Sequence, residues 1–133
     1  MATVTDIMTS DVVTVHMNTP VCDLKGIFIT HRISGAPIVD SQGTIHGLVS
    51  LSDLVHFEST GGDIDQAQVY EIATHNIVTV APDDSLYHAA KVLAATQVHR
   101  LMVIDKDRLV GMISPLDFVR LFAETGRLTA DGS

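Results

Sequence analysis

The chain is built from an internal repeat. When the sequence is shifted by 65 residues, its first half lies over its second half with the same order of structural signals. The matching segments are 7–15 over 72–80, 36–40 over 101–105 and, after one residue is dropped in a turn, 47–53 over 111–117. A repeat of this length means that one supersecondary unit occurs twice, so the fold has to be built from two copies of it.

The first copy shows which elements the unit contains. The β-branched run 12–15 predicts a strand. Thr19 followed by Pro20 is typical of an N-cap and a first helical position. The apolar face of the helix that follows is Val21, Leu24 and Phe28, at helical spacing. The runs 36–39 and 45–49 flank a turn at 40–44 and predict a hairpin. A last helix is expected from Ser50 to about Phe57.

The second copy gives the same succession of elements. Asp84 is predicted to cap its first helix, whose apolar face is Leu86, Ala89, Ala90 and Leu93. The runs 101–104 and 109–113 predict a second hairpin around 105–108. Its last helix is expected from Ser114 to about Phe122.

These elements predict an α/β fold of two pseudo-symmetric β-α-β-β-α repeats. We expect the first repeat at 1–58, a polar linker at 59–69 and the second repeat at 70–133. One repeat of roughly 55 residues buries too little surface to be stable alone, so the two are expected to pack about a pseudo-twofold axis. Clefts along such an axis are natural ligand sites.

Composition excludes several classes of function. The formal net charge is −8, and Lys and Arg do not cluster, so neither nucleic acid nor an anionic membrane is an expected partner. The single cysteine, Cys22, cannot form an internal disulfide and suits a reducing compartment. No apolar run reaches the length of a membrane helix, and the N-terminus lacks a signal peptide pattern. We therefore expect a cytoplasmic protein.

One motif with possible chemistry occurs at matched positions in both copies. It is a Gly, a Ser three residues later and an Asp three residues after that: Gly47, Ser50 and Asp53, then Gly111, Ser114 and Asp117. Ser-x-x-Asp is an ordinary way to start a helix. The same residues would also suit a ligand, because the Asp can accept hydrogen bonds from a ribose diol and Gly permits close approach of a ligand. Both interpretations remain open.

The order of these motifs resembles the tandem CBS-domain family, also called the Bateman module. The resemblance lies in Asp6-Ile7-Met8-Thr9, the Val-Thr-Val strands, Gly35-Ala36-Pro37-Ile38-Val39-Asp40 and the doubled Gly-x-x-Ser-x-x-Asp motif. Many members of that family bind AMP, ADP or ATP in two clefts, and others bind S-adenosylmethionine. The resemblance implies ribose contacts by Asp53 and Asp117, ribose or phosphate contacts by Ser50 and Ser114, and adenine recognition by the backbone of Val13, Thr14, Val78 and Thr79.

A second resemblance concerns phosphate. The segment 98–105 is similar to the His-Arg segment in the γ subunit of AMP-activated protein kinase, where such a pair grips nucleotide phosphate. It implies that His99 and Arg100 serve the site that holds Ser50 and Asp53. The first repeat has Ser34 and Gly35 at these positions, so we expect two unequal sites.

Other chemistries find little support in the sequence. None of the seven histidines has the spacing of a metal-ligand motif, and Cys22 has no basic neighbour that would activate it. No nucleophile and base combine, so we expect neither an enzyme nor a required cofactor or metal. The main hypothesis is a regulatory module that binds an adenine nucleotide and modulates an unknown partner protein. The alternative is an interaction or assembly module whose clefts are empty or hold S-adenosylmethionine.

The family resemblance also implies a homodimer. The contact elements are expected to be the two last helices, 50–57 and 114–122. Their apolar residues are Leu54, Val55, Phe57, Phe118, Leu121 and Phe122, which could instead fill the interface between the two repeats.

Overall fold

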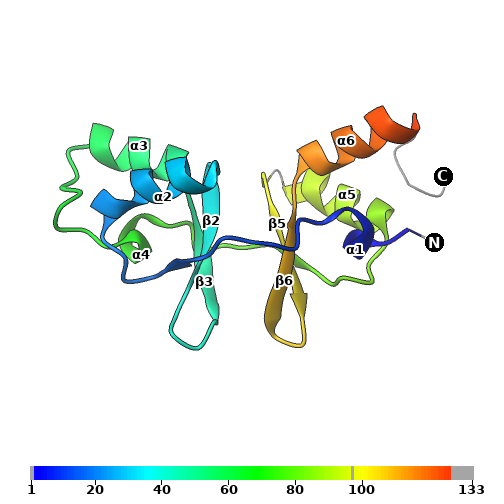
Figure 1. Ribbon diagram of the computed structural model, residues 1–133, viewed down its shortest axis with the longest axis horizontal. Coiled ribbons are helices and arrows are strands. Elements are labelled where there is room, and N and C mark those ends of the chain that lie inside the picture. The colour runs from blue at the N-terminus through cyan, green and yellow to red at the C-terminus, as the bar shows by residue number, and fades with distance from the viewer. Residues whose placement is uncertain (1, 97, 127–133) are drawn as a thin grey trace. The chain divides into compact units, whose positions relative to one another are not determined.

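A computed structural model describes residues 2–96 and 98–126 of the chain (Figure 1). The chain forms two compact units. The contiguous unit consists of residues 13–77, whereas the two-segment unit combines residues 1–12 with residues 78–133. Each unit contains a three-stranded sheet and helices that pack on it.

In the contiguous unit, β1 runs parallel to β2, and β2 runs antiparallel to β3. Its elements are β1 (Val15–His16), η1 (Val21–Asp23), α2 (Leu24–His31), β2 (Gly35–Val39), β3 (Ile45–Ser50), α3 (Leu51–Ser59) and α4 (Val69–Ile72). Helices α2 and α3 lie on the same side of the β2–β3 hairpin (Figure 1).

The two-segment unit repeats this topology, with β4 parallel to β5 and β5 antiparallel to β6. Its elements are α1 (Val4–Ile7), β4 (Thr79–Val80), α5 (Leu86–Thr96), β5 (Leu101–Asp105), β6 (Arg108–Ile113) and α6 (Pro115–Thr125). Both hairpins carry a register shift at the same place, after Ile38 in one and Val103 in the other, opposite Gly47 and Gly111. The mixed α/β fold with two similar repeats is therefore confirmed, including the hairpins and the last helices.

Two predicted helix starts were wrong. Pro20, not Thr19, occupies the N-cap position of η1, and no side chain caps that turn, because the chain enters through a 3₁₀ turn rather than a regular helix. In the second repeat the Ser85 hydroxyl accepts the His88 N–H at 3.0 Å and so caps α5. Asp84 instead accepts the Ala81 N–H at 2.8 Å, which closes the turn before the helix. The strand predicted at 12–15 is also shorter, because it pairs with β2 only at Val15–His16.

Each unit has its own aliphatic core. In the contiguous unit the core lies between the sheet and α2, α3 and α4, and its members are Val15, Val21, Leu24, Phe28, Ala36, Ile38, Val49, Leu54, Ala67 and Val69. In the two-segment unit it is Val4, Val80, Ala89, Leu93, Leu101, Val103 and Ile113. Removal of this apolar surface from water is the main source of stability in each unit.

The short helices α1 and α4 complete these cores. Val4 of α1 and Val69 of α4 are both fully buried, and each begins a helix that packs beside the last strand and last helix of its unit. The segment predicted to be a linker, 59–69, also belongs to the contiguous unit: the Ala67 carbonyl accepts the Val21 N–H at 2.9 Å, and the Ile64 carbonyl accepts the Cys22 N–H at 3.0 Å.

Candidate functional site

The predicted Ser and Asp residues meet at the starts of α3 and α6. Asp53 Oδ2 accepts hydrogen bonds from Ser50 N–H at 2.8 Å and from Ser50 Oγ at 3.0 Å, and Asp53 N–H donates to Ser50 Oγ at 3.2 Å. Asp117 Oδ2 accepts from Ser114 N–H at 2.7 Å and from Ser114 Oγ at 3.3 Å. Both pairs are half-buried capping boxes, so the structural interpretation of Ser-x-x-Asp is confirmed in both repeats.

Capping does not use up these carboxylates. The hydrogen bonds to the side-chain carboxylates of Asp53 and Asp117 all use Oδ2. Within residues 2–96 and 98–126 the Oδ1 atom of each carboxylate has no hydrogen-bond partner. An ionised carboxylate offers about four lone-pair positions. Each Asp therefore holds its helix start in place and still has an oxygen able to accept from a ligand hydroxyl.

The backbone N–H groups at the two helix starts are less available. The Leu51 N–H at the first position of α3 donates to the Ser34 carbonyl at 2.8 Å. The matching residue in α6 is Pro115, which has no N–H. Since Asp53 N–H also has a partner, these helix starts are better suited to hold a hydroxyl through Asp than a phosphate through several N–H groups.

The two motif glycines serve the chain's own packing. A Cβ atom at Gly47 would lie 2.5 Å from the Thr74 carbonyl oxygen. A Cβ atom at Gly111 would lie 2.5 Å from Met8 Sδ and 2.9 Å from the Thr9 carbonyl oxygen. The close approach that each glycine permits is thus made by a segment of the same unit, and an approach by a ligand stays a prediction.

The backbone predicted to recognise adenine differs between the units. Val13 and Val78 are half-buried, and Thr14 and Thr79 are exposed. The Val78 carbonyl accepts the Met102 N–H at 2.9 Å. The residue that matches Met102 in the first repeat is Pro37, which cannot donate, so the Val13 carbonyl receives no equivalent hydrogen bond. The Val13 carbonyl is therefore the more available of the two for a ligand.

The predicted phosphate-binding pair lies in the two-segment unit, directly before β5. His99 is exposed and Arg100 is half-buried. In the contiguous unit the matching residues are Ser34 and Gly35, and the Ser34 carbonyl is bonded to the start of α3. Only one of the two repeats thus presents a cationic side chain at this position.

Asp53 borders an open pocket of about 420 Å³ within the contiguous unit. Its lining comes from α3, the residue that follows it and α4: Ser52, Asp53, His56, Phe57, Thr60, Glu71 and Ile72. Ligand pockets for small molecules are commonly of this size. Asp53 and Glu71 make its polar lining acidic, so this pocket favours an uncharged or cationic group over a phosphate.

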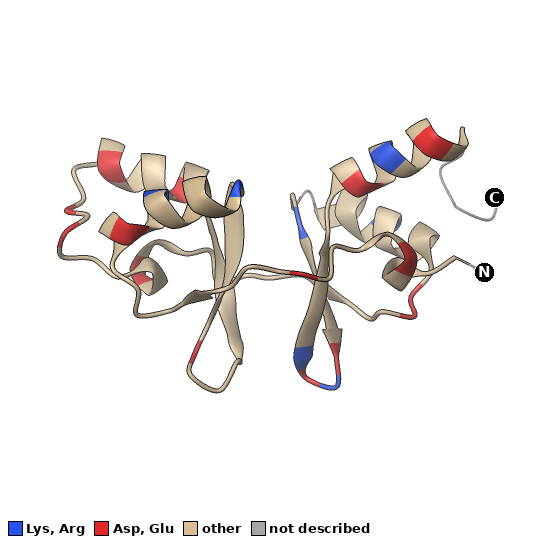
Figure 2. Ribbon diagram, viewed as in Figure 1, with Lys and Arg blue, Asp and Glu red and all other residues tan. Residues whose placement is uncertain are grey.

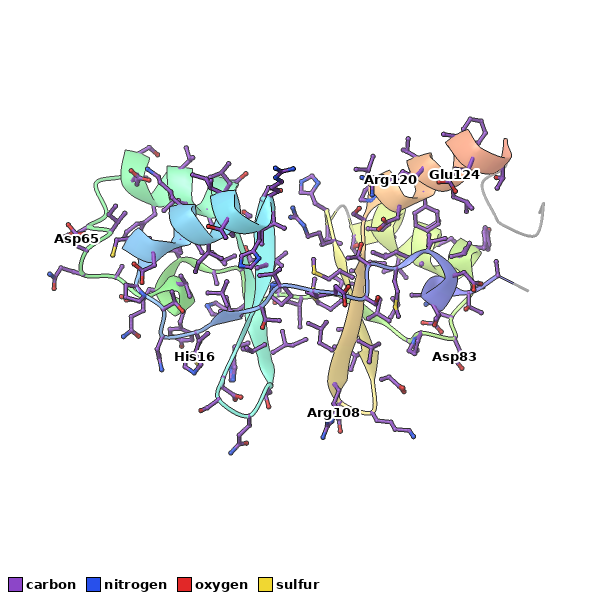
Figure 3. All side chains as sticks on the ribbon, in the orientation of Figure 1. His16, Asp65, Asp83, Arg108, Arg120 and Glu124 are labelled. Atoms are coloured by element: carbon purple, nitrogen blue, oxygen red, sulfur yellow. The ribbon has the colours of Figure 1, made fainter. Side chains whose placement is uncertain are left out.

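The contiguous unit as a whole has a strongly acidic balance. It carries seven Asp and Glu residues against Lys25 and Arg32 alone. Lys25 is further engaged with Glu58, at 3.2 Å. Figure 2 shows basic positions in the two-segment unit at the β5–β6 hairpin and on α6, where Figure 3 labels Arg108 and Arg120. Neither of the two cations of the contiguous unit, Lys25 and Arg32, lines the pocket beside Asp53.

Other reactive groups give no sign of a second chemistry. Among the described residues, no three His, Cys, Asp or Glu side chains are grouped as a metal site would require. Cys22 is exposed, and partial desolvation together with the carboxylates of Asp23 and Asp65 raises the pKa of its thiol, which opposes formation of a thiolate. Over the same residues no helix is long and apolar enough to cross a membrane.

The outer faces of α3 and α6 differ from the prediction. Of the six apolar residues expected to lie at a dimer contact, Val55 and Phe122 are exposed, whereas Leu54, Phe57, Phe118 and Leu121 are partly or fully buried within their own units. The error came from helical phase, because these four lie on the inner faces. The apolar side chains that do face outwards are Leu51, Val55, Leu116, Val119 and Phe122, at 45–59% exposure.

Two tandem copies of the CBS domain match the sequence, at residues 4–59 and 69–124. The chain belongs to the CBS-domain family. Each match begins with a short helix, α1 or α4, and ends in the helix that the Ser-Asp pair starts. The suspected family resemblance is thereby confirmed. The helices that begin the matches, however, pack in the unit that holds the rest of the other match.

Related proteins carry this CBS pair in different contexts. The chain is 29% identical to the CBS domain-containing protein YhcV of Bacillus subtilis, over 86% of this chain and 81% of YhcV. It is also 31% identical to a homoserine O-acetyltransferase of Methanohalobium evestigatum, over 91% of this chain but 24% of the enzyme. A CBS pair can thus form most of one protein and a small part of an enzyme.

Solved structures of similar fold include complexes with adenosyl ligands. The CBS domain pair of protein MJ0100, in complex with 5′-methylthioadenosine and S-adenosyl-L-methionine, has a TM-score of 0.82 and 27% identity, over 93% of this chain and 98% of that one. CBSX2 in complex with AMP has a TM-score of 0.82 and 27% identity, over 96% of this chain and all of CBSX2. Both the fold and the family are shared with proteins that hold an adenosyl group.

Proposed function

We propose that this CBS pair is a regulatory module that binds an adenine nucleotide, AMP, ADP or ATP, and modulates a partner protein. The observation that carries the proposal is the doubled capping box with an open carboxylate oxygen. Asp53 and Asp117 would accept hydrogen bonds from ribose hydroxyls through Oδ1, while Oδ2 keeps the carboxylate oriented. Ser50 and Ser114 would hold the same helix starts and lie beside the ribose or phosphate.

The other predicted residues complete such a site. Backbone groups at Val13 and Thr14, and at Val78 and Thr79, would recognise adenine. His99 and Arg100 would bind phosphate, because the planar guanidinium group donates two parallel hydrogen bonds. The partner protein would respond to whether the site is occupied.

A ligand without phosphate is the second candidate, and the pocket beside Asp53 favours it. Two carboxylates, Asp53 and Glu71, line that pocket. They would attract the sulfonium of S-adenosylmethionine and disfavour a phosphate. The same fold in MJ0100 holds S-adenosyl-L-methionine and 5′-methylthioadenosine.

Titration calorimetry with dialysed protein tests both candidates. AMP, ADP, ATP, S-adenosylmethionine, 5′-methylthioadenosine and adenosine would be compared at up to millimolar concentration, with inorganic phosphate as a control for a bare anion. We expect heat from at least one adenine nucleotide and none from phosphate alone. Binding only to S-adenosylmethionine would support the second candidate, and the absence of heat with every adenosyl compound would contradict both.

We also propose a homodimer that forms through α3 and α6. Leu116, Val119 and Phe122 form an exposed apolar stripe on α6, and Leu51 and Val55 form a smaller one on α3. Contiguous apolar surface of this kind marks protein contacts. Light scattering at micromolar concentration should give twice the monomer mass, and Val119→Glu should lower it. A mass of 14.3 kDa for the unaltered chain would contradict the dimer.

A further inference from the structure

The segments that lead into the two CBS matches are exchanged between the units. The first leading segment, residues 2–12, begins the match at 4–59 but packs in the two-segment unit, where most of the second match lies. The second leading segment, residues 68–77, begins the match at 69–124 but packs in the contiguous unit. Each leading segment is therefore next to one CBS repeat in sequence but packs in the unit that contains most of the other repeat.

Equivalent contacts fix the two segments. Val4 is fully buried, and its N–H donates to the Asp84 carbonyl at 2.9 Å. Val69 is fully buried as well, and its N–H donates to the Thr19 carbonyl at 2.8 Å. Ile7 and Met8 pack against the core of the two-segment unit, as Ile72 and Ala73 do in the contiguous unit. Each segment is thus an integral part of the core it joins.

Both segments also reach the candidate ligand sites. Thr9 and Met112 exchange two backbone hydrogen bonds of 2.9 Å, two residues before Ser114. Thr74 and Leu48 exchange two of 2.8 Å, two residues before Ser50. The motif glycines allow these contacts, because a side chain at either position would meet the segment.

The second segment makes two additional contacts. Glu71 and Ile72 of α4 line the pocket beside Asp53. The His75 ring lies between two backbone carbonyls, with Nδ1 2.9 Å from that of His46 and Nε2 3.1 Å from that of Tyr70. Whichever nitrogen carries the proton, the ring can donate to one of them. The matching residue in the first segment is Ser10, which is too short for such a bridge.

We propose that each leading segment is a positioning element for the site in the unit on which it packs, rather than for the CBS repeat that it begins. Residues 2–12 hold the strand end that presents Ser114 and Asp117, and residues 68–77 hold the one that presents Ser50 and Asp53. A partner or modification that displaces residues 2–12 therefore acts on the Asp117 site and leaves the Asp53 site intact. This last consequence rests on the proposed function. The stabilisation of one unit by each leading segment does not.

Amide hydrogen exchange on the full chain without ligand tests which unit each leading segment stabilises. Val4→Ala and Val69→Ala form a matched pair, because both positions are fully buried and begin four-residue helices. Val4→Ala should lower the protection of β5 and β6 about tenfold and leave β2 and β3 unchanged, since the loss of two buried methyl groups destabilises one core. Val69→Ala should do the reverse. Val21→Ala, in the contiguous unit, is the control that should match Val69→Ala.

Loss of protection in β2 and β3 on Val4→Ala, or an equal loss in both units, would overturn the proposal. If a variant does not fold, the unaltered chain in low denaturant gives the same test. The Thr9 amide should then exchange with the opening free energy of the Met112 amide, and the Thr74 amide with that of Leu48; a Thr9 amide that follows Leu48 would overturn the proposal. Failure of every adenosyl compound to bind would refute the proposed function and leave this result unchanged.

Discussion

The contiguous and two-segment units share one fold but carry different polar groups. At four matched places the contiguous unit has Pro37, Ser34 with Gly35, Leu51 and His75. There the two-segment unit has Met102, His99 with Arg100, Pro115 and Ser10. The first set leaves a carbonyl open at Val13 and ties the start of α3 to Ser34. The second set supplies the Arg100 guanidinium group and the exposed His99 ring, whereas the imidazole of the first set, His75, contacts two backbone carbonyls.

This difference teaches that the repeat conserves a scaffold rather than a site. An aliphatic core, a register shift in the hairpin and a capping box at the last helix occur in both units. The groups that would recognise adenine and phosphate are not. If both units bind a ligand, we expect two sites of unequal affinity and specificity.

The largest expected effect concerns the two glycines. Gly47→Ala should cost about 3 kcal/mol of unfolding free energy, because its Cβ would lie 2.5 Å from a backbone oxygen that is held by the Leu48–Thr74 pair. Gly111→Ala should cost less, about 2 kcal/mol, because its Cβ would meet the flexible Met8 side chain at 2.5 Å and a backbone oxygen, that of Thr9, only at 2.9 Å. Urea unfolding of both variants measures this. Equal costs would mean that the two segments are held equally firmly.

The next effect concerns phosphate. Arg100→Ala should weaken ATP binding tenfold or more, by about 1.5–3 kcal/mol, and leave adenosine almost unchanged. Asp53→Asn should weaken both ligands, because the ribose contact is common to them. Calorimetry on the single variants and on the double variant forms a thermodynamic cycle. We predict coupling between Arg100 and Asp53; coupling with Asp117 instead would assign the phosphate to the other site.

A smaller effect is expected at the capping boxes. Ser50→Ala should cost about 1 kcal/mol, because Asp53 N–H loses its side-chain acceptor. Ser114→Ala should cost less, since Asp117 N–H donates to the Ser114 carbonyl at 3.0 Å, which the substitution leaves in place. Thermal unfolding of the two variants gives the comparison. A larger loss of stability for Ser114→Ala than for Ser50→Ala would contradict the difference that these hydrogen bonds predict.

The smallest effect concerns the two hairpin turns. In the β2–β3 turn, the hydrogen bond from His46, at 2.8 Å, and the N–H groups of Thr44 and Gln42 hold the pKa of Asp40 below its ordinary value of 3.8. A lowered pKa stabilises the folded state above pH 3.8, and this stability is lost as pH falls through the lower folded value. The β5–β6 turn instead relies on Lys106 and Asp107, both with positive φ.

Asp40→Asn should therefore remove a small acid-dependent part of the stability. Urea unfolding of the variant and the unaltered chain, followed from about pH 5 to pH 3, measures it. Asp105→Asn, at the matching position of the other hairpin, is the control and should leave this pH dependence in place. If the stability of Asp40→Asn falls with decreasing pH as much as that of the unaltered chain, the His46 contact does not contribute to the acid dependence.

The sequence predicted elements whose signals are local. Turn residues around β-branched runs located both hairpins, and Ser-x-x-Asp located the starts of α3 and α6. Local signals misled where two neighbours compete, as at Thr19 and Pro20 or at Asp84 and Ser85. The phase of a short helix is also ambiguous, so Leu54 and Leu121 were expected at a dimer contact or between the repeats, although each is buried in its own unit.

The roles of Gly47 and Gly111 could not be predicted, because they depend on contacts with Thr74 and Met8 that are distant in sequence. The same holds for the exchange of the leading segments. A pattern with period 65 shows that two units exist, but it does not show which unit each short segment joins. The candidate site residues rest on a motif that occurs twice and on roles that the family resemblance implies, so their part in ligand binding stays a prediction.

The most direct test of the central claim is a calorimetric titration of AMP into the unaltered chain, Asp53→Asn and Asp117→Asn. Asn keeps a side-chain oxygen for the cap and removes the charge offered to the ribose. We expect two unequal sites in the unaltered chain, with each variant losing or weakening a different one. Two unweakened sites in both variants would contradict the assignment of the ribose to these carboxylates.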